Sequence, residues 1–439
     1  MQSLISMFDK PKIPSHNCTG CGACKNVCRH NCITMIEDEK GFYYPIIDKS
    51  ICVNCKACIH VCPVINTSPK REIHQTYACK NLDEKVRLSS TSGGLFIAIA
   101  NYVIDRGGVV IGACFDKDWN VRHEYAETKE DVVKFKGSKY VQSEVSHIYP
   151  VLKNFLKEKR LVLFSGTPCQ VAGIRSFLHR DYDNLILLDF ICHGVPSRKV
   201  WKKYLNDECG LSYNKELELN RNDGCSIIGG TIYDRPIIQS INFRNKKTGW
   251  QNYSFSLTLS NVSADGGQKT VSHSMIAWNH PYMKGFIGSL YLRPSCYSCP
   301  MKGFRSNSDF TLADAWGIGN YIPEWNDDKG ISLCIIHNKK AEKILGYLSG
   351  IEIRKVNKEI IDRHNEAAYL CPDRNRRTNR FYNLMKKNVS FNEIIDSCFP
   401  KPSMLDKIMW SINQRISNYS APPMSMSNRL TVVLQQELH

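Results

Sequence analysis

The chain has 439 residues, of which 42% are hydrophobic, so it is long enough for two or three domains and is not a disordered protein. The net charge of +16 is compatible with an anionic partner, but the basic residues are scattered. No basic helix interleaved with aromatic residues indicates a nucleic-acid groove, so no nucleic-acid partner is expected. Solvated surface charge is the default interpretation. Docking of an acidic electron carrier, a ferredoxin or a flavodoxin, is the second.

The compartment follows from the cysteines and from the apolar segments. No stretch approaches about 18 uninterrupted apolar residues, so we expect no membrane span. The first residues, MQSLISMFDKPKIPSHN, lack the basic start and apolar run of a signal peptide. There are 20 cysteines in spacings typical of metal clusters and reduced thiols, which predicts a cytoplasmic protein.

Two cysteine-rich runs follow a tail at residues 1–16. The runs CTGCGACKNVC and CVNCKACIHVCP repeat the spacing Cys-x2-Cys-x2-Cys-x3-Cys. This is the bacterial ferredoxin pattern, in which the fourth cysteine of each run ligates the cluster of the other run. The expected ligand sets are Cys18, Cys21, Cys24 and Cys62 for one 4Fe–4S cluster, and Cys52, Cys55, Cys58 and Cys28 for the other.

Zinc or disulfides are the alternatives for these cysteines. Zinc takes two pairs of ligands, so a third cysteine at the same short step would be surplus. Two features depart from the usual pattern: Arg29 stands where a proline often follows the fourth cysteine, and Cys32 is a ninth cysteine. We interpret Cys32 as a small buried residue rather than a ligand. Residues 17–66 are thus expected to form a two-cluster ferredoxin domain, and residues 67–76 a linker.

Helices and strands alternate in the larger domain, expected at residues 77–372. In chain order we predict a helix at 94–104, a strand at 108–113, helices at 131–136 and 150–159, a strand at 161–164, a helix at 169–178, a strand at 184–191 and a helix at 197–205. This alternation indicates an α/β fold with a mostly parallel sheet, whose loops at the strands' carboxyl ends build the site.

The pattern changes from about residue 238. Residues 239–244 and 253–259 resemble an antiparallel hairpin inserted into this domain, and further strands are expected at 310–312 and 331–336, with a helix at 339–348. Residues 373–439 are expected to be a basic C-terminal tail carrying a helix at 405–416, with the last twenty residues loosely ordered.

Four glycine-bearing turns mark a candidate cofactor site. They are Ser92-Gly93-Gly94, Gly137-Ser138-Lys139-Tyr140, Ser165-Gly166-Thr167-Pro168-Cys169-Gln170 and Cys192-His193-Gly194-Val195-Pro196. Glycine lets backbone approach a cofactor closely, and a helix start offers free N–H groups to a pyrophosphate or an anionic flavin ring. Taken singly each is an ordinary turn. Cys169 would stand at a helix start, where a thiolate is favoured.

A late pair, Cys296 and Cys299, adds two more thiols. With Cys169 and Cys192 this pair would complete a third four-thiolate cluster. The alternative is that Cys169 and Cys192 are core thiols and that the late pair stabilises the fold. His193 is either a proton donor or a loop histidine with its hydrogen bonds satisfied.

The strings SSTSGGLFIAIANYVIDRGGVVIGA, FKGSKYVQS, VLFSGTPCQVAGI, LLDFICHGVPS and LRPSCYSCPMKGFRSNSDFTLADAWGIG resemble the family of coenzyme F420-reducing hydrogenase/dehydrogenase beta subunits. The resemblance implies an FAD-binding domain, iron–sulfur clusters and, in some members, chemistry on a deazaflavin. It implies that the following residues lie near the flavin: Ser92, Gly93, Gly94, Lys139, Tyr140, Gly166, Thr167 and Gln170. The fused ferredoxin domain is a departure from the family, and no string identifies a pocket for coenzyme F420.

The expected function is that of an iron–sulfur flavoprotein oxidoreductase acting on a small-molecule substrate. In that hypothesis Lys139 stabilises the reduced, anionic flavin, and Cys169 or His193 delivers a proton. Its partner is a redox carrier protein or another redox enzyme subunit. The alternative is a non-catalytic electron-transfer subunit of a larger redox complex, and a third interpretation places structural clusters in a nucleic-acid protein.

Overall fold

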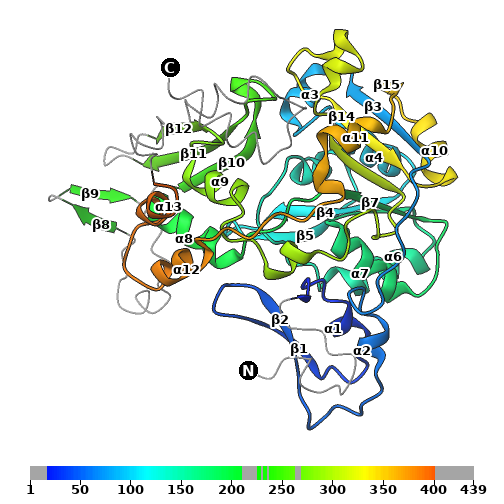
Figure 1. Cartoon of the computed structure of the whole chain (residues 1–439), viewed down its shortest axis with the longest axis horizontal. Helices are drawn as coiled ribbons and strands as arrows, with labels where there is room; N and C mark the ends of the chain where they lie inside the picture. Colours follow the sequence, from blue (N-terminus) through cyan, green and yellow to red (C-terminus); the bar gives the residue numbers. More distant parts are fainter. Residues whose placement is uncertain (1–16, 210–224, 229–230, 235–236, 263–267, 401–439) are drawn as a thin grey trace, which may run out of the picture.

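The computed structural model describes residues 17–209, 225–228, 231–234, 237–262 and 268–400 (Figure 1). The predicted helix at 405–416 lies outside these residues. A small module of residues 17–66 protrudes from the lower side of a larger α/β body, and a second antiparallel sheet lies on the left of the view (Figure 1). Within the described residues, no helix is long and apolar enough to cross a membrane.

The small module consists of two short helices and one hairpin: α1 (Ala23–Val27), β1 (Ile33–Glu37), β2 (Tyr43–Ile47) and α2 (Ala57–His60). The hairpin is antiparallel, with Ile33 opposite Ile47. Each helix starts after a residue with positive φ, Gly22 at 82° and Lys56 at 61°. These turns bring cysteines three residues apart to the same side of the chain.

The main sheet has eight strands in the order β15-β3-β14-β13-β7-β6-β4-β5. Their bounds are β3 (Gln75–Asn81), β4 (Val109–Phe115), β5 (Val121–Ala126), β6 (Val162–Ser165), β7 (Leu185–Phe190), β13 (Phe310–Asp314), β14 (Ser332–Ile336) and β15 (Ile351–Lys355). The central neighbours β4, β6, β7 and β13 pair in parallel.

The prediction of a mostly parallel sheet was wrong, because the sheet is mixed. The pairs β4–β5, β13–β14, β14–β3 and β3–β15 are all antiparallel. The link between β4 and β5 explains one of them: it is too short for a crossover helix, and Asp116 closes it by accepting hydrogen bonds from the N–H groups of Asp118 and Asn120.

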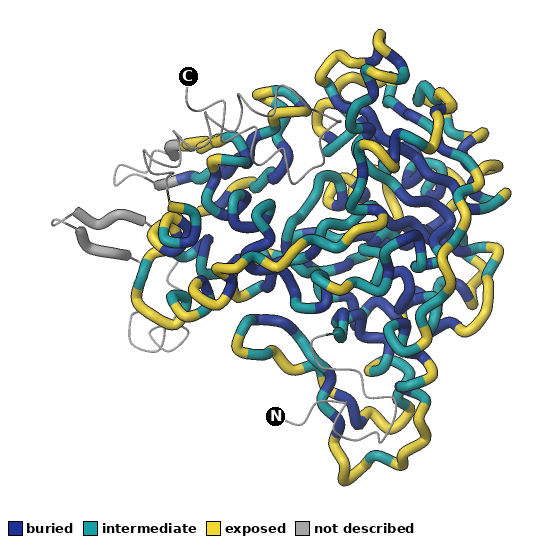
Figure 2. Tube along the Cα trace, viewed as in Figure 1, coloured by how far each residue is buried: buried dark blue, intermediate teal, exposed yellow. Residues whose placement is uncertain are grey.

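Helices cover both faces of the sheet. On one face α4 (Leu95–Ile104) and α10 (Lys339–Gly346) pack against strand residues that include Leu163 and Ile186. On the other, α6 (Ile148–Lys157) and α7 (Pro168–Leu178) pack against their neighbours Val162 and Leu185. Because both faces are covered, β4, β6 and β7 contain runs of buried apolar residues that do not alternate with polar ones, at 109–111, 162–164 and 185–188 (Figure 2).

The remaining elements are α3 (Glu84–Ser89), α5 (Lys129–Val132), α8 (Arg198–Cys209), β8 (Cys225–Ile228), β9 (Thr231–Asp234), β10 (Ile237–Asn245), β11 (Ser254–Val262), β12 (Gln268–Ile276), α9 (Pro281–Ile287), α11 (Glu359–His364), α12 (Thr378–Met385) and α13 (Phe391–Cys398). Strands β10, β11 and β12 form an antiparallel sheet, as predicted for the insertion.

The described part of the C-terminal segment is not a tail. Phe381 on α12 and Phe391 on α13 are fully buried in an aromatic core that also contains Trp201 on α8 and Phe255 on β11. The basic composition of this segment concealed these apolar positions. Helices α12 and α13 therefore pack in the same core as α8 and β11.

Candidate functional site

Four cysteines of the small module line a cavity at its free end: Cys28, Cys52, Cys55 and Cys58. We call them the outer cysteines. Cys28 comes from the first run and the other three from the second, which is the crossed arrangement expected from the ferredoxin pattern. Cys58 is buried, whereas Cys55 is exposed.

The ninth cysteine lies in the same cavity. Cys32 is buried, and its Sγ lies 3.3 Å from the Sγ of Cys28. It is thus a small buried residue, as predicted, but it also contacts one of the outer cysteines directly. With Cys28 as a thiolate, the S–H of Cys32 would be the donor of this contact.

The other four cysteines of the module face the large domain: Cys18, Cys21, Cys24 and Cys62. We call them the inner cysteines. Burial raises the pKa of the Cys24 thiol well above its usual value, and the neighbouring inner cysteines raise it further. Four thiolates gathered in such a place need a cationic group among them, and the iron of a cluster supplies that charge.

Helices α6 and α7 hold the inner cysteines against the large domain. The hydroxyl of Tyr149 on α6 donates a hydrogen bond of 2.8 Å to the carbonyl oxygen of Cys21. Gly173 on α7 faces the same residue, and Cys21 shares a hydrophobic cluster with both helices. The inner side of the module is therefore part of the core rather than a surface.

Arg293 is the second attachment of the module. Its guanidinium donates to the carbonyl oxygens of Cys18 (2.8 Å) and Tyr43 (2.9 Å), and to Oε1 of Gln142 in the large domain (3.0 Å). Its exposed fraction is 1%. Sequence reasoning missed this residue, because no local pattern relates it to a partner 275 positions away.

A further cavity lies in the large domain next to the inner cysteines. Its lining contains all four cysteines expected for a third cluster: Cys169, Cys192, Cys296 and Cys299. We call them the central cysteines. Cys169 starts α7 after β6, Cys192 follows β7, and the other two lie in the turn at 294–298 and just after it. Two of the four thus come from the carboxyl ends of parallel strands, as expected.

Cys169 lies near both groups of cysteines, since it raises the pKa of inner Cys21 and of central Cys299. Burial raises the pKa of Cys169 itself. The prediction of a favoured thiolate at this helix start was therefore wrong for the protein without bound metal, because loss of solvent outweighs the helix terminus.

Two more residues lie beside the central cysteines: one lines their cavity, and the other contacts Cys299. His193 lines it, its Nε2 lies 3.1 Å from Oγ of Ser289, and burial lowers its pKa to about 4. Cys371, which has no cysteine partner in the sequence, accepts a hydrogen bond of 3.1 Å at its Sγ from the backbone N–H of Cys299. Among the described residues, no three histidine, cysteine or carboxylate side chains converge closely enough to hold a single metal ion.

The residues expected near a flavin form two groups. The first lies between the main sheet and β10: Ser92 donates to Asp314, and Arg244 on β10 donates to Asp314 (3.0 Å) and to the hydroxyl of Tyr140 (3.3 Å). Arg244 is buried, and its Nε has no hydrogen-bond partner in the described parts of the chain.

The second group surrounds the start of α7. Thr167 and Gln170 form a capping box, and Nε2 of Gln170 donates to Oγ of Ser143 (2.9 Å). Gly166 precedes them, and its N–H donates to the carbonyl oxygen of Leu188 on β7 (3.1 Å). This group adjoins the central cysteines rather than Ser92.

One extended segment, residues 138–143, connects the two groups. The N–H of Ser138 donates to Oγ1 of Thr91 (2.9 Å), Tyr140 contacts Arg244, Gln142 contacts Arg293, and Ser143 contacts Gln170. Lys139 in this segment is half-buried, and its Nζ donates to the carbonyl oxygens of residues 135, 136 and 137. Burial lowers its pKa to about 8.

The glycines of the 92–94 turn serve the fold as well. A Cβ on Gly93 would stand 2.2 Å from the carbonyl oxygen of Cys79 and 2.6 Å from the N of Ser332, so this glycine permits contact with β3 and β14. Gly94 has a φ of 84° and precedes α4. The expected close approach at Gly93 is thus made by other strands of the sheet.

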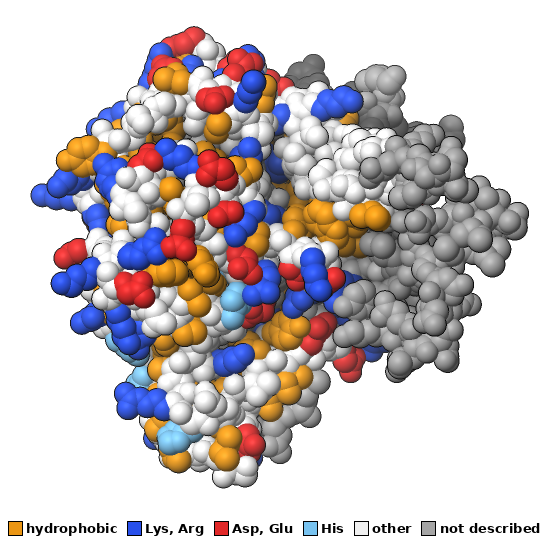
Figure 3. Space-filling model, turned by 180° about the vertical axis from the view of Figure 1, so that it is seen from behind, with side chains coloured by type: hydrophobic (Ala, Val, Ile, Leu, Met, Phe, Trp, Pro, Cys, Tyr) orange, Lys and Arg blue, Asp and Glu red, His pale blue; other side chains and the backbone are white. Residues whose placement is uncertain are grey.

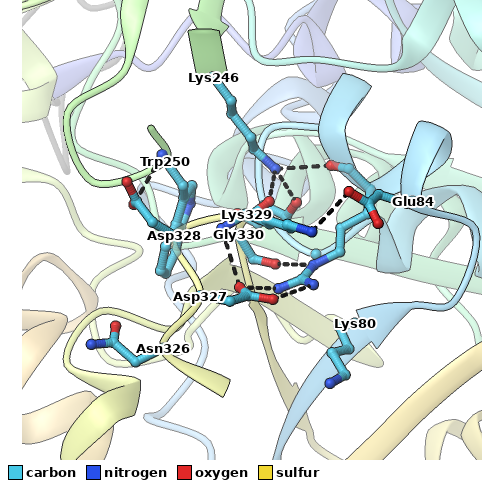
Figure 4. Close-up of polar contacts among 12 residues, drawn as sticks. Lys80, Glu84, Lys246, Trp250, Asn326, Asp327, Asp328, Lys329 and Gly330 are labelled. Atoms are coloured by element: carbon cyan, nitrogen blue, oxygen red, sulfur yellow. Dashed lines mark hydrogen bonds and ion pairs between the residues drawn. The ribbon is translucent and has the colours of Figure 1, made fainter. Parts of the chain in front are cut away.

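Lys246, which follows β10, fixes the same turn from the other side. Its Nζ donates to the carbonyl oxygens of Arg87 (2.9 Å), Ser92 (2.6 Å) and Lys329 (2.8 Å) (Figure 4). Beside it, Arg87 forms a paired contact with Asp327. Burial lowers the pKa of Lys246 to about 7.

Comparisons with known proteins agree with this architecture. Residues 76–149 and 159–359 match models that describe the N-terminal and the C-terminal part of the "Coenzyme F420 hydrogenase/dehydrogenase, beta subunit", and residues 17–66 match a "4Fe-4S dicluster domain". The chain is 25% identical over 198 residues to the coenzyme F420-dependent sulfite reductase of Methanocaldococcus jannaschii, covering 44% of this chain and 30% of that protein. It is 24% identical over 185 residues to a subunit of the F420H2 dehydrogenase of Methanosarcina mazei, covering 39% and 51%.

The chain thus spans 30% of the length of the first of these relatives and about half the length of the second. A chain in a solved structure of the F420-reducing [NiFe] hydrogenase complex from Methanosarcina barkeri aligns with 78% of this chain and 92% of its own length, at 16% identity and a TM-score of 0.40. The two beta-subunit models together match more than half of the chain. The chain therefore belongs to the family of coenzyme F420 hydrogenase/dehydrogenase beta subunits and carries a 4Fe–4S dicluster domain at residues 17–66.

Proposed function

We propose that this chain is an iron–sulfur flavoprotein oxidoreductase, which passes electrons between its 4Fe–4S clusters and a bound FAD that acts on a small organic substrate or coenzyme. The observation that carries the proposal is the series of outer, inner and central cysteines, each a complete set of four. Cys169 lies close enough to Cys21 to raise its pKa, so the inner and central sets are neighbours. A series of this kind suits electron transfer in single steps.

Each set supplies the four thiolates that a 4Fe–4S cluster needs. The outer and inner sets would hold the two clusters of the dicluster domain, with Cys28 and Cys62 as the crossed ligands. The central set would hold a third cluster, and the cavity that its members line supports this assignment. If Cys169 ligates iron it does not also deliver a proton, which leaves His193 for proton transfer beside the central set. Because burial lowers its pKa, the His193 ring is neutral at pH 7 and must take up a proton before it delivers one.

The residues between the main sheet and β10 fit a flavin. Arg244 has a buried Nε without a partner among the described residues, and such an atom calls for an acceptor. Ser92 and Tyr140 contact the same ion pair, and the start of α4 offers unpaired N–H groups to a pyrophosphate. When bound, a flavin exchanges two electrons with an organic molecule and one at a time with clusters.

Lys139 contributes positive charge to this region. Its pKa of about 8 keeps the ammonium protonated at neutral pH, and three backbone carbonyls hold it in place. A cation held in this way would stabilise a reduced, anionic flavin. Coenzyme F420 is a candidate substrate, because two relatives bear it in their names.

The test is the cofactor content of the full chain after anaerobic reconstitution. We expect stoichiometric FAD and three clusters. The double substitution Cys192→Ser/Cys296→Ser should remove four irons and leave the two ferredoxin signals in electron paramagnetic resonance. Cys114→Ser, a change at a buried cysteine on β4, is the control and should keep the full iron content. A preparation without flavin would contradict the enzyme assignment.

A second candidate is an electron-transfer subunit of a larger redox complex. The name of one relative, a dehydrogenase subunit, favours it. The two candidates differ in turnover by the isolated chain. Reduction of F420 or another small acceptor by the reconstituted chain alone supports the enzyme, whereas cluster reduction without turnover supports the subunit.

A further inference from the structure

We propose that the free end of the dicluster domain is a docking surface for a small acidic electron-carrier protein, which exchanges electrons with the cluster held by the outer cysteines. This inference deepens the proposed function by assigning the site of electron exchange with a partner. It rests on the iron–sulfur part of that function and is independent of the flavin.

The outer cysteines are the only set with an exposed member in the described part of the chain. Cys55 is exposed, whereas the inner cysteines lie against α7 and the central cysteines are at most partly accessible. The loop that carries Cys55 is an exposed run at the far end of the module (Figure 2). A partner that binds here reaches a cluster ligand without displacing any of the residues that the structure describes.

Two large apolar side chains close to Cys55 in the sequence are exposed to solvent. The exposed fractions are 48% for Ile51 and 59% for Val53, and Val53 lines the cavity of the outer cysteines. In a docked complex they would exclude water from the centre of the contact, as the apolar centre of an interface does.

Basic side chains surround the apolar pair. Arg29, Lys49 and Lys56 are exposed, and Lys56 lines the cavity together with His30. Asp48 is the only acidic residue between positions 41 and 71, and Ser50 engages its carboxylate through both N–H (2.9 Å) and Oγ (2.6 Å). Viewed from behind, basic, histidine and hydrophobic side chains lie together at this end of the module, with an acidic side chain beside them (Figure 3).

Charge decides which partner fits. An apolar centre with a positive rim attracts a protein with an acidic face and orients it during encounter, which raises the association rate. Small acidic ferredoxins and flavodoxins have this chemistry. A basic carrier would be repelled by the same rim.

The experiment measures how fast the clusters of the full-length, anaerobically reconstituted chain are reduced. The probe is a reduced, acidic two-cluster bacterial ferredoxin, and the signal is loss of cluster absorbance in a stopped-flow instrument. The test variant is Lys49→Glu/Lys56→Glu, with Lys49→Gln/Lys56→Gln as the milder form. The matched control is Lys339→Glu/Lys343→Glu, which makes the same charge change at exposed positions on α10.

We expect the second-order rate constant to fall about tenfold or more in the glutamate variant, with a weaker dependence on salt. The glutamine variant should lie between, Val53→Ser should also slow the reaction, and the α10 control should match the wild type. Reduction by dithionite should be equal in all variants with full iron content.

Equal rates in the wild type and the glutamate variant, or an equal fall in the α10 control, would overturn the docking surface. A faster reaction in the glutamate variant would do the same, because it would show that the positive rim does not attract the acidic ferredoxin. The signal comes from the clusters, so a chain that lacks flavin but responds as expected contradicts the flavoprotein alone. A flavin-loaded chain that fails to respond contradicts the docking surface alone.

Discussion

Gly173 and Cys21, on different domains, are in such close contact that a methyl group would not fit between them. A Cβ added to Gly173 would stand 2.9 Å from the Cβ of Cys21 and 3.1 Å from its Sγ. It would also stand 2.6 Å from the hydroxyl of Tyr149, which holds the carbonyl of Cys21. The contact of α7 with the inner cysteines therefore depends on the absence of a side chain at position 173.

Gly173→Ala should push the dicluster domain away from α7. Overpacking of this kind costs ~1–3 kcal/mol of stability. We expect a lower urea midpoint and, for the clusters proposed at the inner and central cysteines, slower electron transfer between the two, measured by rapid-freeze spectroscopy.

Gly346→Ala is the control for this change. It lies on α10, and an added Cβ there meets no described heavy atom within 4 Å. It should be neutral or stabilising by ~0.5–1 kcal/mol, since alanine favours helix more than glycine does. Equal effects of the two substitutions would contradict the close contact.

Arg293→Lys should loosen the same domain contact by a different route. Lysine keeps the charge but cannot reproduce a planar fork that bonds to Cys18, Tyr43 and Gln142 at once. We expect a loss of ~2–4 kcal/mol in the free energy of unfolding and faster hydrogen exchange in residues 17–47.

The exposed Arg354, paired with Glu324, is the comparison for this substitution. Arg354→Lys should change stability by less than ~0.5 kcal/mol. Unchanged exchange in the Arg293→Lys variant would show that the fork does not hold the domain.

Cys32→Ala should lower the reduction potential of the outer cluster. A reduced cluster is more negative, so an S–H donor on the thiolate of Cys28 stabilises it, and loss of the donor disfavours reduction. A contribution of ~0.5–1.5 kcal/mol corresponds to roughly 20–60 mV for one electron. A redox titration followed by electron paramagnetic resonance measures the shift.

Two results would speak against this role of Cys32: no shift, or an equal shift in a Cys114→Ala variant, whose cysteine is buried on β4 in the large domain. The potential of the inner cluster should stay unchanged in both variants.

The stability of the protein should fall in mild acid through His280. The neutral ring bonds Tyr204 through Nε2 (3.0 Å) and accepts from the N–H of Met283, and burial lowers its pKa to about 3. Because the folded pKa lies below the unfolded value of about 6.5, its contribution is complete above pH 6.5 and is lost as the pH falls toward 3.

Urea unfolding at pH 7 and pH 5 tests this. We expect His280 to account for roughly 2 kcal/mol of the stability lost over this interval. His280→Asn keeps an N-cap acceptor for α9. Between pH 7 and pH 5, the free energy of unfolding of this variant should fall by roughly 2 kcal/mol less than that of the wild type. An identical loss in both proteins would show that another group dominates.

The cysteine sets and the central strands could be predicted from the sequence because their signals are local. Thiolates three residues apart around Cys18 and Cys52 define a cluster pattern, and apolar runs such as 161–164 define buried strands. Capping residues add to this: Thr167 and Gln170 mark the start of α7 directly.

The strand directions and the contacts between domains could not be predicted, because they depend on residues that are distant in the sequence. The antiparallel edge formed by β3, β14 and β15 pairs residues that are 253 to 278 positions apart in the sequence, and no local pattern indicates the direction of these strands. Arg293, Gly173 and Cys371 act through contacts with residues 72 to 275 positions away. The pKa of Cys169 was predicted wrongly for a related reason: burial raises it, and burial is not visible in the local sequence.

The hydrogen bonds of Arg293 fix the dicluster domain to the large domain. The dicluster domain therefore does not move between an electron donor and an electron acceptor. In a redox protein whose carrier domain moves between two sites, the rate of electron transfer falls as the solvent viscosity rises, because the domain must diffuse. In this protein, electron transfer between the proposed clusters needs no domain movement. Glycerol should therefore lower the rate of association with a partner protein and leave the rate of electron transfer within the chain unchanged.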